Sequence, residues 1–396
     1  MQRVDLAYAQ LGSSEVARDI NRDLVLQLIR TRQPVSRADL SRYSGLQPST
    51  ISSIVEQLLR ERWISEGPVA QRPRGRRPTL LSLNQAIVML AVDVQPRQAT
   101  LAVVDVNGHA LSRETVALVR DPHRGVEALG TAMLRLMQQH PDRVFEGAGL
   151  SMPGRVDPAT QRLVFAPNLP WCGADVRSLL QQRLKLKVEM ENAANACLLS
   201  ELWFGRMDGV RHAVLITIAE GVGAAILVGG QLVSGAHGMA GEFGHIAIDR
   251  NGPPCGCGRR GCWEVFASSR AALQEYARLS GRPVPTAIAE LLELVRNGDS
   301  HARAALVRQA RYLGMGLHNI TATLAPEVIL LTGGLTAMWD TLVPYIAEEL
   351  AKHTLAGEPP VLRPTSDLEM ARLKGAAALV LQRHTGAQGE AAARTR

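Results

Sequence analysis

Four potential metal ligands in one short segment constrain the fold of this chain more than any other feature. They follow the spacing H-x9-C-x-C-x4-C and are His245, Cys255, Cys257 and Cys262. One imidazole and three thiolates suit a closed tetrahedral zinc ion, and no coordination position remains open for a substrate. The backbone can wrap closely round the ion at Gly256, Gly258 and Gly261. We therefore expect structural Zn2+, and the alternative is three reduced thiols without a ligand.

The other cysteines and the apolar pattern bear on the compartment. Cys172 and Cys197 are isolated, and we interpret both as packing residues. Five cysteines cannot all pair, no apolar run reaches the roughly 18 residues of a membrane helix, and the charged N-terminus lacks the apolar core of a secretory signal. A metal site then explains the clustered cysteines better than disulfides do. We expect a cytoplasmic protein without membrane insertion.

Residues 1–84 have the pattern of a winged helix-turn-helix. A first helix over 19–33 would bury one face, formed by Ile20, Leu24, Val25 and Leu28. Ser36 is a candidate N-cap for a second helix, Gly45 suits the turn that follows, and Pro48 suits the first turn of a third helix. The third helix would bury Ile51, Ile54, Val55 and Leu58. Three such helices predict a DNA-binding unit.

The same region carries the candidate DNA contacts. On the third helix we expect them at Gln47, Ser49, Thr50, Ser52 and Ser53. Trp63 and Ile64 would begin one wing strand and 79–83 would form the other, and the tip between them carries Arg72, Arg74, Arg76 and Arg77. Of these we expect Arg74, Arg76 and Arg77 to contact DNA, where guanidinium groups bind phosphates or enter a minor groove.

The charge of the chain supports this reading. Residues 1–80 contain 13 arginines, no lysine and eight acidic residues, so they hold +5 of the formal net charge of +7. A basic excess on one part of a chain is typical of nucleic-acid binding. The alternative is a helical interaction domain with a basic linker.

From about residue 86 the pattern changes to α/β. Strand-like runs such as AIVMLAVDV, HAVLITIAEGVGAAILVGG and PEVILLTGGL alternate with helical stretches, and glycines follow the strands. About 300 residues are too many for one compact core, so we expect two lobes over 85–383. The Gly/Ala/Arg-rich stretch 384–396 is expected to be a flexible tail.

This second region resembles the ROK family (repressor, open reading frame, kinase). The matching segments, in the order of the family, are SMPGRVD, NLPWCGADV, VEMENAANA, ELWFG, ITIAEGVGA, GAHGMAGEFGHIAID, CGCGRRGCWE and LTGGL. The resemblance implies an actin-like, sugar-kinase-like fold of two α/β lobes. Together with the N-terminal winged helix-turn-helix, it implies the architecture of the family's sugar-responsive repressors.

The resemblance also implies a set of sugar-binding residues. They are Gly154, Arg155, Asn168, Asn192, Glu242, His245 and Glu264. Amides and carboxylates of this kind hydrogen-bond the hydroxyls of a sugar. One ring nitrogen of His245 would bind zinc while the other faces a sugar hydroxyl. Surface charge is the alternative for the two glutamates, and Arg155 could instead pair with Asp157 or with a phosphate or carboxylate of the ligand.

Three departures from the family's kinases argue against phosphoryl transfer, so no catalytic residue is predicted. Ala193 stands where the kinases carry the general base Asp, and a methyl group accepts no proton. The first phosphate loop keeps Asp93 but continues Gln95-Pro96-Arg97, and Pro96 has no N–H to offer. In the second phosphate loop, the negative charge of Glu220 would repel the phosphates of a nucleotide.

Taken together, these patterns predict a DNA-binding transcriptional repressor and not an enzyme. Its partners would be a double-stranded DNA operator and a sugar or sugar-phosphate effector, and it would act as a homodimer or homotetramer. Two alternatives remain open. One is a bifunctional ATP-dependent sugar kinase, and the other is a regulator controlled by a protein partner such as a sugar-transport protein.

Overall fold

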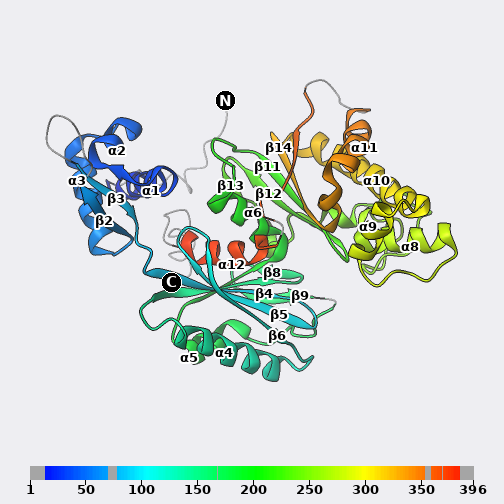
Figure 1. Cartoon of the computed structure of the whole chain (residues 1–396), viewed down its shortest axis with the longest axis horizontal. Helices are drawn as coiled ribbons and strands as arrows, with labels where there is room; N and C mark the ends of the chain where they lie inside the picture. The colour runs from blue at the N-terminus through cyan, green and yellow to red at the C-terminus, as the bar shows by residue number, and fades with distance from the viewer. Residues whose placement is uncertain (1–13, 70–77, 167, 353–357, 368, 384–396) are drawn as a thin grey trace.

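The N-terminal helices and strands form the winged helix-turn-helix that the sequence predicts. The computed structural model describes residues 14–69, 78–166, 168–352, 358–367 and 369–383. Its first elements are α1 (Ser14–Arg32), β1 (Val35–Ser36), α2 (Arg37–Ser44), α3 (Pro48–Arg60), β2 (Ile64–Val69) and β3 (Thr79–Leu83). The three strands form an antiparallel sheet in the order β1-β3-β2. Figure 1 shows this unit, in blue, at one end of the molecule.

Local sequence signals set the ends of these helices as expected. The Ser36 side chain accepts a hydrogen bond from the backbone N–H of Asp39, whose carboxylate in turn accepts one from the backbone N–H of Ser36. Gly45 ends α2 with φ +71°, a conformation that favours glycine, and Pro48 occupies the first turn of α3. The expected stripe of α3 is buried, at Ile51, Ile54, Val55 and Leu58.

The expected inner face of α1 is right for Val25 and Leu28, which pack into the core, and wrong for Ile20 and Leu24. The side chain of Ile20 is 63% exposed and that of Leu24 is 37% exposed, whereas Val25, Leu26 and Ile29 are buried. These three residues belong to one apolar cluster with residues of α3, β3 and the distant C-terminal helix α12 (Ala371–Gln382). The face of α1 is therefore set by its tertiary contacts with α2, α3 and β3, in a cluster that α12 extends, and helical periodicity alone does not reveal these contacts.

Two five-stranded sheets form the framework of the α/β region. The first has the order β10-β7-β4-β5-β6 and comprises β4 (Ile87–Val94), β5 (Gln98–Asp105), β6 (Ala110–Ala117), β7 (Val144–Met152) and β10 (Val188–Asn192). The second has the order β13-β12-β11-β14-β15 and comprises β11 (Ala213–Ile218), β12 (Val222–Val228), β13 (Gln231–Leu232), β14 (Val328–Gly333) and β15 (Val361–Pro364). A two-stranded ribbon adds β8 (Arg155–Asp157) and β9 (Arg162–Phe165).

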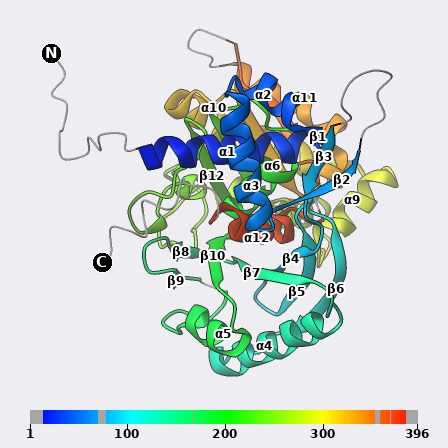
Figure 2. The same ribbon diagram turned by 90° about the vertical axis from the view of Figure 1, so that its left-hand side faces the viewer.

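Helices cover both sheets and fill the space between them. The outer face of the first sheet packs on α4 (Pro122–Gln138) and α5 (Val176–Leu184). The second sheet packs on α7 (Glu264–Ala267), α8 (Ser269–Ser280), α9 (Ile288–Arg296), α10 (Ser300–Leu324) and α11 (Trp339–Ala351). Between the sheets lie α6 (Ala193–Phe204), on the second, and α12, on the first. Figure 2 shows the winged helix-turn-helix in front of this pair.

The two central helices are packed backbone against backbone. A Cβ atom added at Gly375 of α12 would lie 1.8 Å from the carbonyl oxygen of Ala196 in α6. A Cβ at Gly149 of β7 would lie equally close to the carbonyl oxygen of Ala376. Glycine is therefore required at both contacts.

Among the described residues no helix is both long and apolar enough to cross a membrane.

This packing predicts a large cost for one added methyl group. Gly375→Ala forces α12 and α6 apart, and we expect a net loss of at least about 2 kcal/mol in the free energy of unfolding after the gain in helix propensity. At roughly 2–4 °C per kcal/mol, the thermal midpoint should fall by about 4–8 °C. Gly67→Ala in β2 is the control, because its Cβ would meet only ordinary contact at 3.6 Å. Equal midpoints for the two variants would contradict the close packing.

Candidate functional site

The predicted metal ligands converge on one point beside the second sheet. His245 ends the short helix η3 (Glu242–His245), and the three cysteines lie in the loop between η3 and α7. One ligand atom from each of the four residues lies within 4.8 Å of every other. The loop is held by a bridge between Ala247 and Cys262 and by another between Pro254 and Arg260. The fold thus brings together what the spacing predicts.

The distances within the cluster fit a zinc ion. Cys255 Sγ lies 3.5 Å from His245 Nδ1, and Cys257 Sγ lies 3.6 Å from Cys262 Sγ. Zn–S bonds of about 2.3 Å and Zn–N bonds of about 2.0–2.1 Å place tetrahedral ligand pairs about 3.6–3.8 Å apart. The donor set and its spacing therefore suit structural zinc, and no open position is left for a substrate.

The thiols respond differently to their surroundings. The backbone N–H of Arg259 lowers the pKa of Cys257, which favours its thiolate. Burial raises the pKa of Cys262 to about 12, so its thiolate needs a compensating positive charge. Among the loop glycines, Gly258 and Gly261 adopt φ of +87° and +65°, whereas Gly256 has no such conformation. Two of the three loop glycines, Gly258 and Gly261, therefore adopt backbone conformations that favour glycine, as the expected close wrapping of the ion requires.

Three of the predicted sugar-site residues surround the metal cluster. His245 Nε2 lies 3.8 Å from Glu242 Oε2, on the opposite side of the ring from the cysteine contact. Glu264 Oε1 lies 3.7 Å from Cys255 Sγ, and its Oε2 accepts a hydrogen bond from the backbone N–H of Val222. The side chain of Glu264 is only 15% exposed, so the alternative of ordinary surface charge does not hold for it. Glu242 is 47% exposed.

Two more candidates lie at the end of the first sheet. Asn192 pairs with Met152 at the carboxyl ends of β10 and β7, and Gly154 follows Met152 by two residues. The Asn192 side chain accepts a hydrogen bond from the backbone N–H of Asn195 and so caps α6. The carboxylate of the buried Glu191 accepts hydrogen bonds from Asn192 N and Asn195 Nδ2. Asn192 is therefore part of a fixed polar cluster.

Arg155 does not use the partner considered for it. Asp157 accepts hydrogen bonds from the backbone N–H groups of Ala159 and Thr160, and lies 3.1 Å from His237 Nδ1. Arg155 Nε is buried without a hydrogen-bond partner in the described part of the chain. His237 adopts φ +52° within η2 (Ala236–Gly238), which packs against β8. Sequence reasoning missed this histidine, although flanking glycines mark its segment.

The remaining candidates are Asn168 and the predicted DNA contacts, and the structure describes only some of them. Asn168 follows β9 and is exposed. On α3, Ser49 and Ser53 are exposed, Thr50 and Ser52 are half-buried, and Gln47 is exposed at the N-cap. Outside the described residues lie the wing-tip arginines Arg72, Arg74, Arg76 and Arg77 and the tail 384–396.

The three segments compared above with the family's kinases each follow a strand. Ala193 is the first residue of α6, and Gln95-Pro96-Arg97 forms the turn between β4 and β5. Buried Asp93 accepts a hydrogen bond from Gln95 Nε2 at 2.8 Å and lies 3.8 Å from Arg372 Nη1. Burial raises the pKa of Asp93, and Arg372 opposes this rise. Glu220 is exposed in the turn between β11 and β12.

Known proteins resemble this chain in sequence and in architecture. Residues 89–383 match the ROK family. The xylose repressor of Bacillus spizizenii is 30% identical over 356 residues, which cover 87% of this chain and 89% of that protein. A glucokinase of Streptomyces coelicolor is 30% identical over 307 residues, covering 74% of this chain and 95% of the enzyme. The crystal structure of a ROK family transcriptional regulator, a homolog of the Escherichia coli MLC protein, matches with a TM-score of 0.81 and 27% identity, covering 96% of this chain and 99% of that one.

The metal cluster yields a direct test. Cys257→Ser removes one ligand, so we expect bound zinc, measured by elemental analysis, to fall well below the value for the unaltered protein. The thermal midpoint should fall with it, because the loop loses its cross-link. The structure confirms Cys197 as a packing residue, but Cys172 is exposed, so the same interpretation is wrong for Cys172. Cys172→Ser, outside the cluster, should therefore change neither quantity. A Cys257→Ser protein that keeps its full zinc content would refute the assigned ligand set.

Proposed function

The chain belongs to the ROK family, and from this membership we propose that it is a sugar-responsive transcriptional repressor. The observation that carries the proposal is the winged helix-turn-helix in front of the two-lobed region. The match to the xylose repressor covers 87% of the chain, a share that cannot be reached within 85–383 alone. The glucokinase match covers 74%. The combination of a DNA-binding unit with a sugar-kinase-like region is therefore shared with repressors.

In this proposal residues 1–84 bind the operator. The exposed polar face of α3 would enter the major groove through Gln47, Ser49, Thr50, Ser52 and Ser53. Arg74, Arg76 and Arg77 of the wing would contact phosphates or the minor groove. A homodimer or homotetramer would present two such units to a pseudo-palindromic site.

The effector would bind between the two lobes of 85–383. Gly154, Arg155, Asn168 and Asn192 would approach a sugar from the first sheet, and Glu242, His245 and Glu264 from the second. Zinc would supply no catalytic step; it would hold the His245 ring so that Nε2 faces the ligand beside Glu242. The unpartnered Arg155 Nε is a donor available to a hydroxyl or a phosphate of the effector.

We propose further that the protein does not phosphorylate its effector. Ala193 cannot act as the general base that sugar kinases need. The Asp93 carboxylate is engaged by Gln95 and Arg372 of its own chain. Glu220 would repel a nucleotide. Bifunctional kinase activity remains the second candidate because the family includes glucokinases.

A thermal-shift screen distinguishes sensor from kinase. Purified zinc-replete protein is heated with D-xylose, D-glucose, N-acetyl-D-glucosamine, their phosphates, or ATP with magnesium. We expect one sugar or sugar phosphate to raise the thermal midpoint, because ligand binding stabilises the folded state, and ATP to leave it unchanged. Stabilisation by ATP would favour the kinase, and a response to no sugar would favour control by a protein partner.

The wing can be tested by the salt dependence of DNA binding. Arg76→Ala should weaken operator binding and reduce the slope of log K against log salt concentration by about 0.9 for each lost phosphate contact. Arg296→Ala is the matched control, because this exposed arginine ends α9 in the α/β region. An unchanged slope for Arg76→Ala would remove the wing from the DNA interface.

A further inference from the structure

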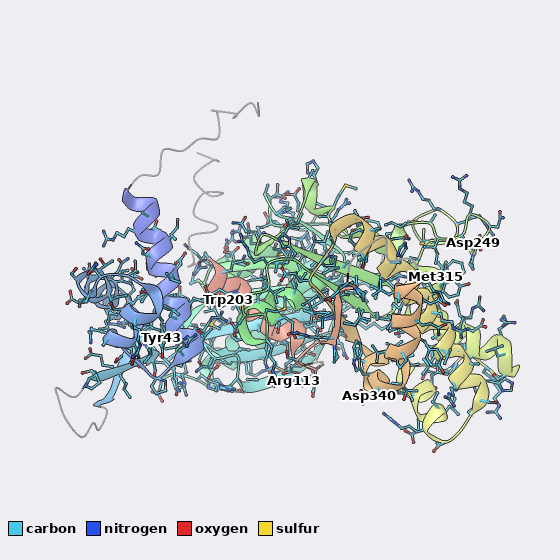
Figure 3. All side chains as sticks on the ribbon, turned by 90° about the horizontal axis from the view of Figure 1, so that it is seen from above. Tyr43, Arg113, Trp203, Asp249, Met315 and Asp340 are labelled. Carbon is cyan, nitrogen blue, oxygen red and sulfur yellow. The ribbon has the colours of Figure 1, made fainter. Side chains whose placement is uncertain are left out.

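An arginine of α1 links the winged helix-turn-helix to the end of a central helix. Arg30 Nη1 donates hydrogen bonds to the carbonyl oxygen of Trp203 and, at 3.4 Å, to that of Leu202. Its guanidinium carbon lies 5.0 Å from the centroid of the Trp203 ring. Both carbonyls belong to the last turn of α6, where the helix dipole favours a cation. Figure 3 shows Trp203 on the side of the α/β region nearest the winged helix-turn-helix.

Burial of Arg30 makes it costly to replace its hydrogen bonds to the α6 carbonyls by hydrogen bonds to water. Burial lowers the pKa of Arg30, and the nearby carboxylate of Asp208 opposes that shift. A guanidinium withdrawn from solvent needs hydrogen-bond partners, and the α6 carbonyls supply them. Arg30 should therefore follow these carbonyls if the end of α6 moves.

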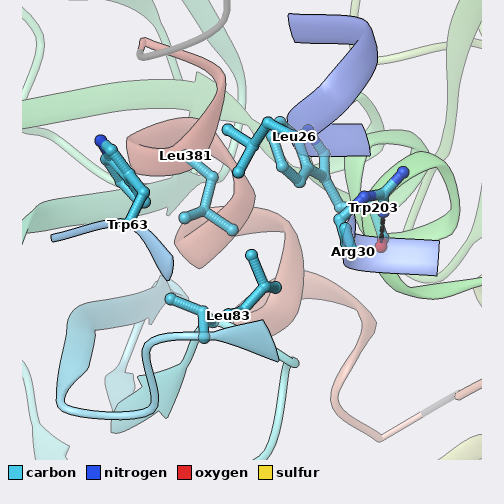
Figure 4. Close-up of a pocket in the computed structure, with 7 residues that line it drawn as sticks. Leu26, Arg30, Trp63, Leu83, Trp203 and Leu381 are labelled. Atoms are coloured by element: carbon cyan, nitrogen blue, oxygen red, sulfur yellow. Dashed lines mark hydrogen bonds between the residues drawn. The ribbon is translucent and has the colours of Figure 1, made fainter. Parts of the chain in front are cut away.

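The apolar contacts beside Arg30 are incomplete. A small, partly open cavity of about 20 Å³ lies within the apolar contact between the winged helix-turn-helix and α12, beside the end of α6. It is lined by Leu26, Arg30, Trp63, Leu83, Val106, Trp203 and Leu381. Figure 4 shows Arg30 bonded to Trp203 at one side of this space. Side chains facing a cavity lack contacts on that side, so a shift across it breaks fewer contacts than in a filled interface.

The opposite end of α6 lies in the proposed sugar site. Asn192 caps the helix, and a sugar hydroxyl bound to its amide would act on the first turn directly. The helix has 12 residues and is therefore about 18 Å long. Every side chain from Ala194 to Glu201 is buried, and Ala196 is in backbone contact with Gly375 of α12. A helix packed along its whole length in this way is expected to shift as a rigid body, because bending would break these contacts.

We propose that α6 transmits sugar binding to the DNA-binding unit and that Arg30 is the residue that receives the movement. This inference rests on the proposed function and specifies how the sugar site is coupled to the operator. If sugar binding shifts α6 at Asn192, Leu202 and Trp203 at the other end of the helix would shift by the same amount. Arg30, which is hydrogen-bonded to their carbonyls, would move α1 with them. Arg30 is thus a positioning residue that contacts neither sugar nor DNA.

The test measures how strongly sugar binding changes operator affinity, and it does not depend on the stability of the fold. Operator DNA is selected from genomic fragments by the unaltered protein, and its dissociation constant is measured with and without the panel sugar that gives the largest thermal shift. The ratio of the two constants is expected to be about 5–150 for the unaltered protein. For Arg30→Ala we expect this ratio to approach 1 while the sugar, measured by calorimetry without DNA, still binds. Arg30→Lys should restore part of the ratio, because an ammonium group can donate to the same carbonyls.

Arg32→Ala is the matched control. Arg32 lies on the same helix and carries the same charge, but it stacks on Tyr43 within the winged helix-turn-helix. Its loss should alter operator affinity with and without sugar equally and leave the ratio unchanged. An Arg30→Ala protein with the unaltered ratio overturns this inference alone. An unaltered protein whose operator affinity responds to no sugar contradicts the proposed function, and this inference with it.

Discussion

The contact between α6 and α12 is the constraint on which the rest of the molecule depends. Gly375 brings the backbone of one helix against the Ala196 carbonyl of the other, and Gly149 seats α12 equally closely on the first sheet. The two helices fill the layer between the sheets, so the lobes cannot be packed independently. The same α12 supplies Leu373, Ala376, Ala377, Val380 and Leu381 to the apolar cluster of α1 and β3. One helix pair thereby joins both lobes and the DNA-binding unit.

The metal loop fixes the second lobe by a different means. Trp263 of this segment is buried and Ile248 packs against the core of the second lobe, and four potential ligands in the same segment add the means for a metal cross-link. Glu264 connects this loop to the start of β12 through the backbone N–H of Val222. In the proposed function, a zinc ion would order this loop and so position Glu242, His245 and Glu264 at its two ends.

Sequence alone predicted the features that depend on neighbours in the chain. Ser36, Gly45 and Pro48 act on their own turns, and the metal ligands are close together in sequence, so both could be recognised from spacing. The sugar-site residues came from resemblance, because they come from separate loops. The buried face of α1 was predicted only in part, because tertiary contacts with α2, α3 and β3 select it. The contact of Arg30 with Trp203 was not foreseen, since the two residues lie 173 positions apart. Contacts of that range leave no periodic signal.

We expect sugar binding and operator binding to be coupled to each other through this framework. The most direct measurement is the affinity of the stabilising sugar for the protein, taken by calorimetry with and without bound operator at one fixed salt concentration. Because coupling between two ligands is reciprocal, the account predicts that operator changes the sugar dissociation constant by the same factor as sugar changes that of the operator, about 5–150-fold. An identical sugar affinity in both conditions would contradict it.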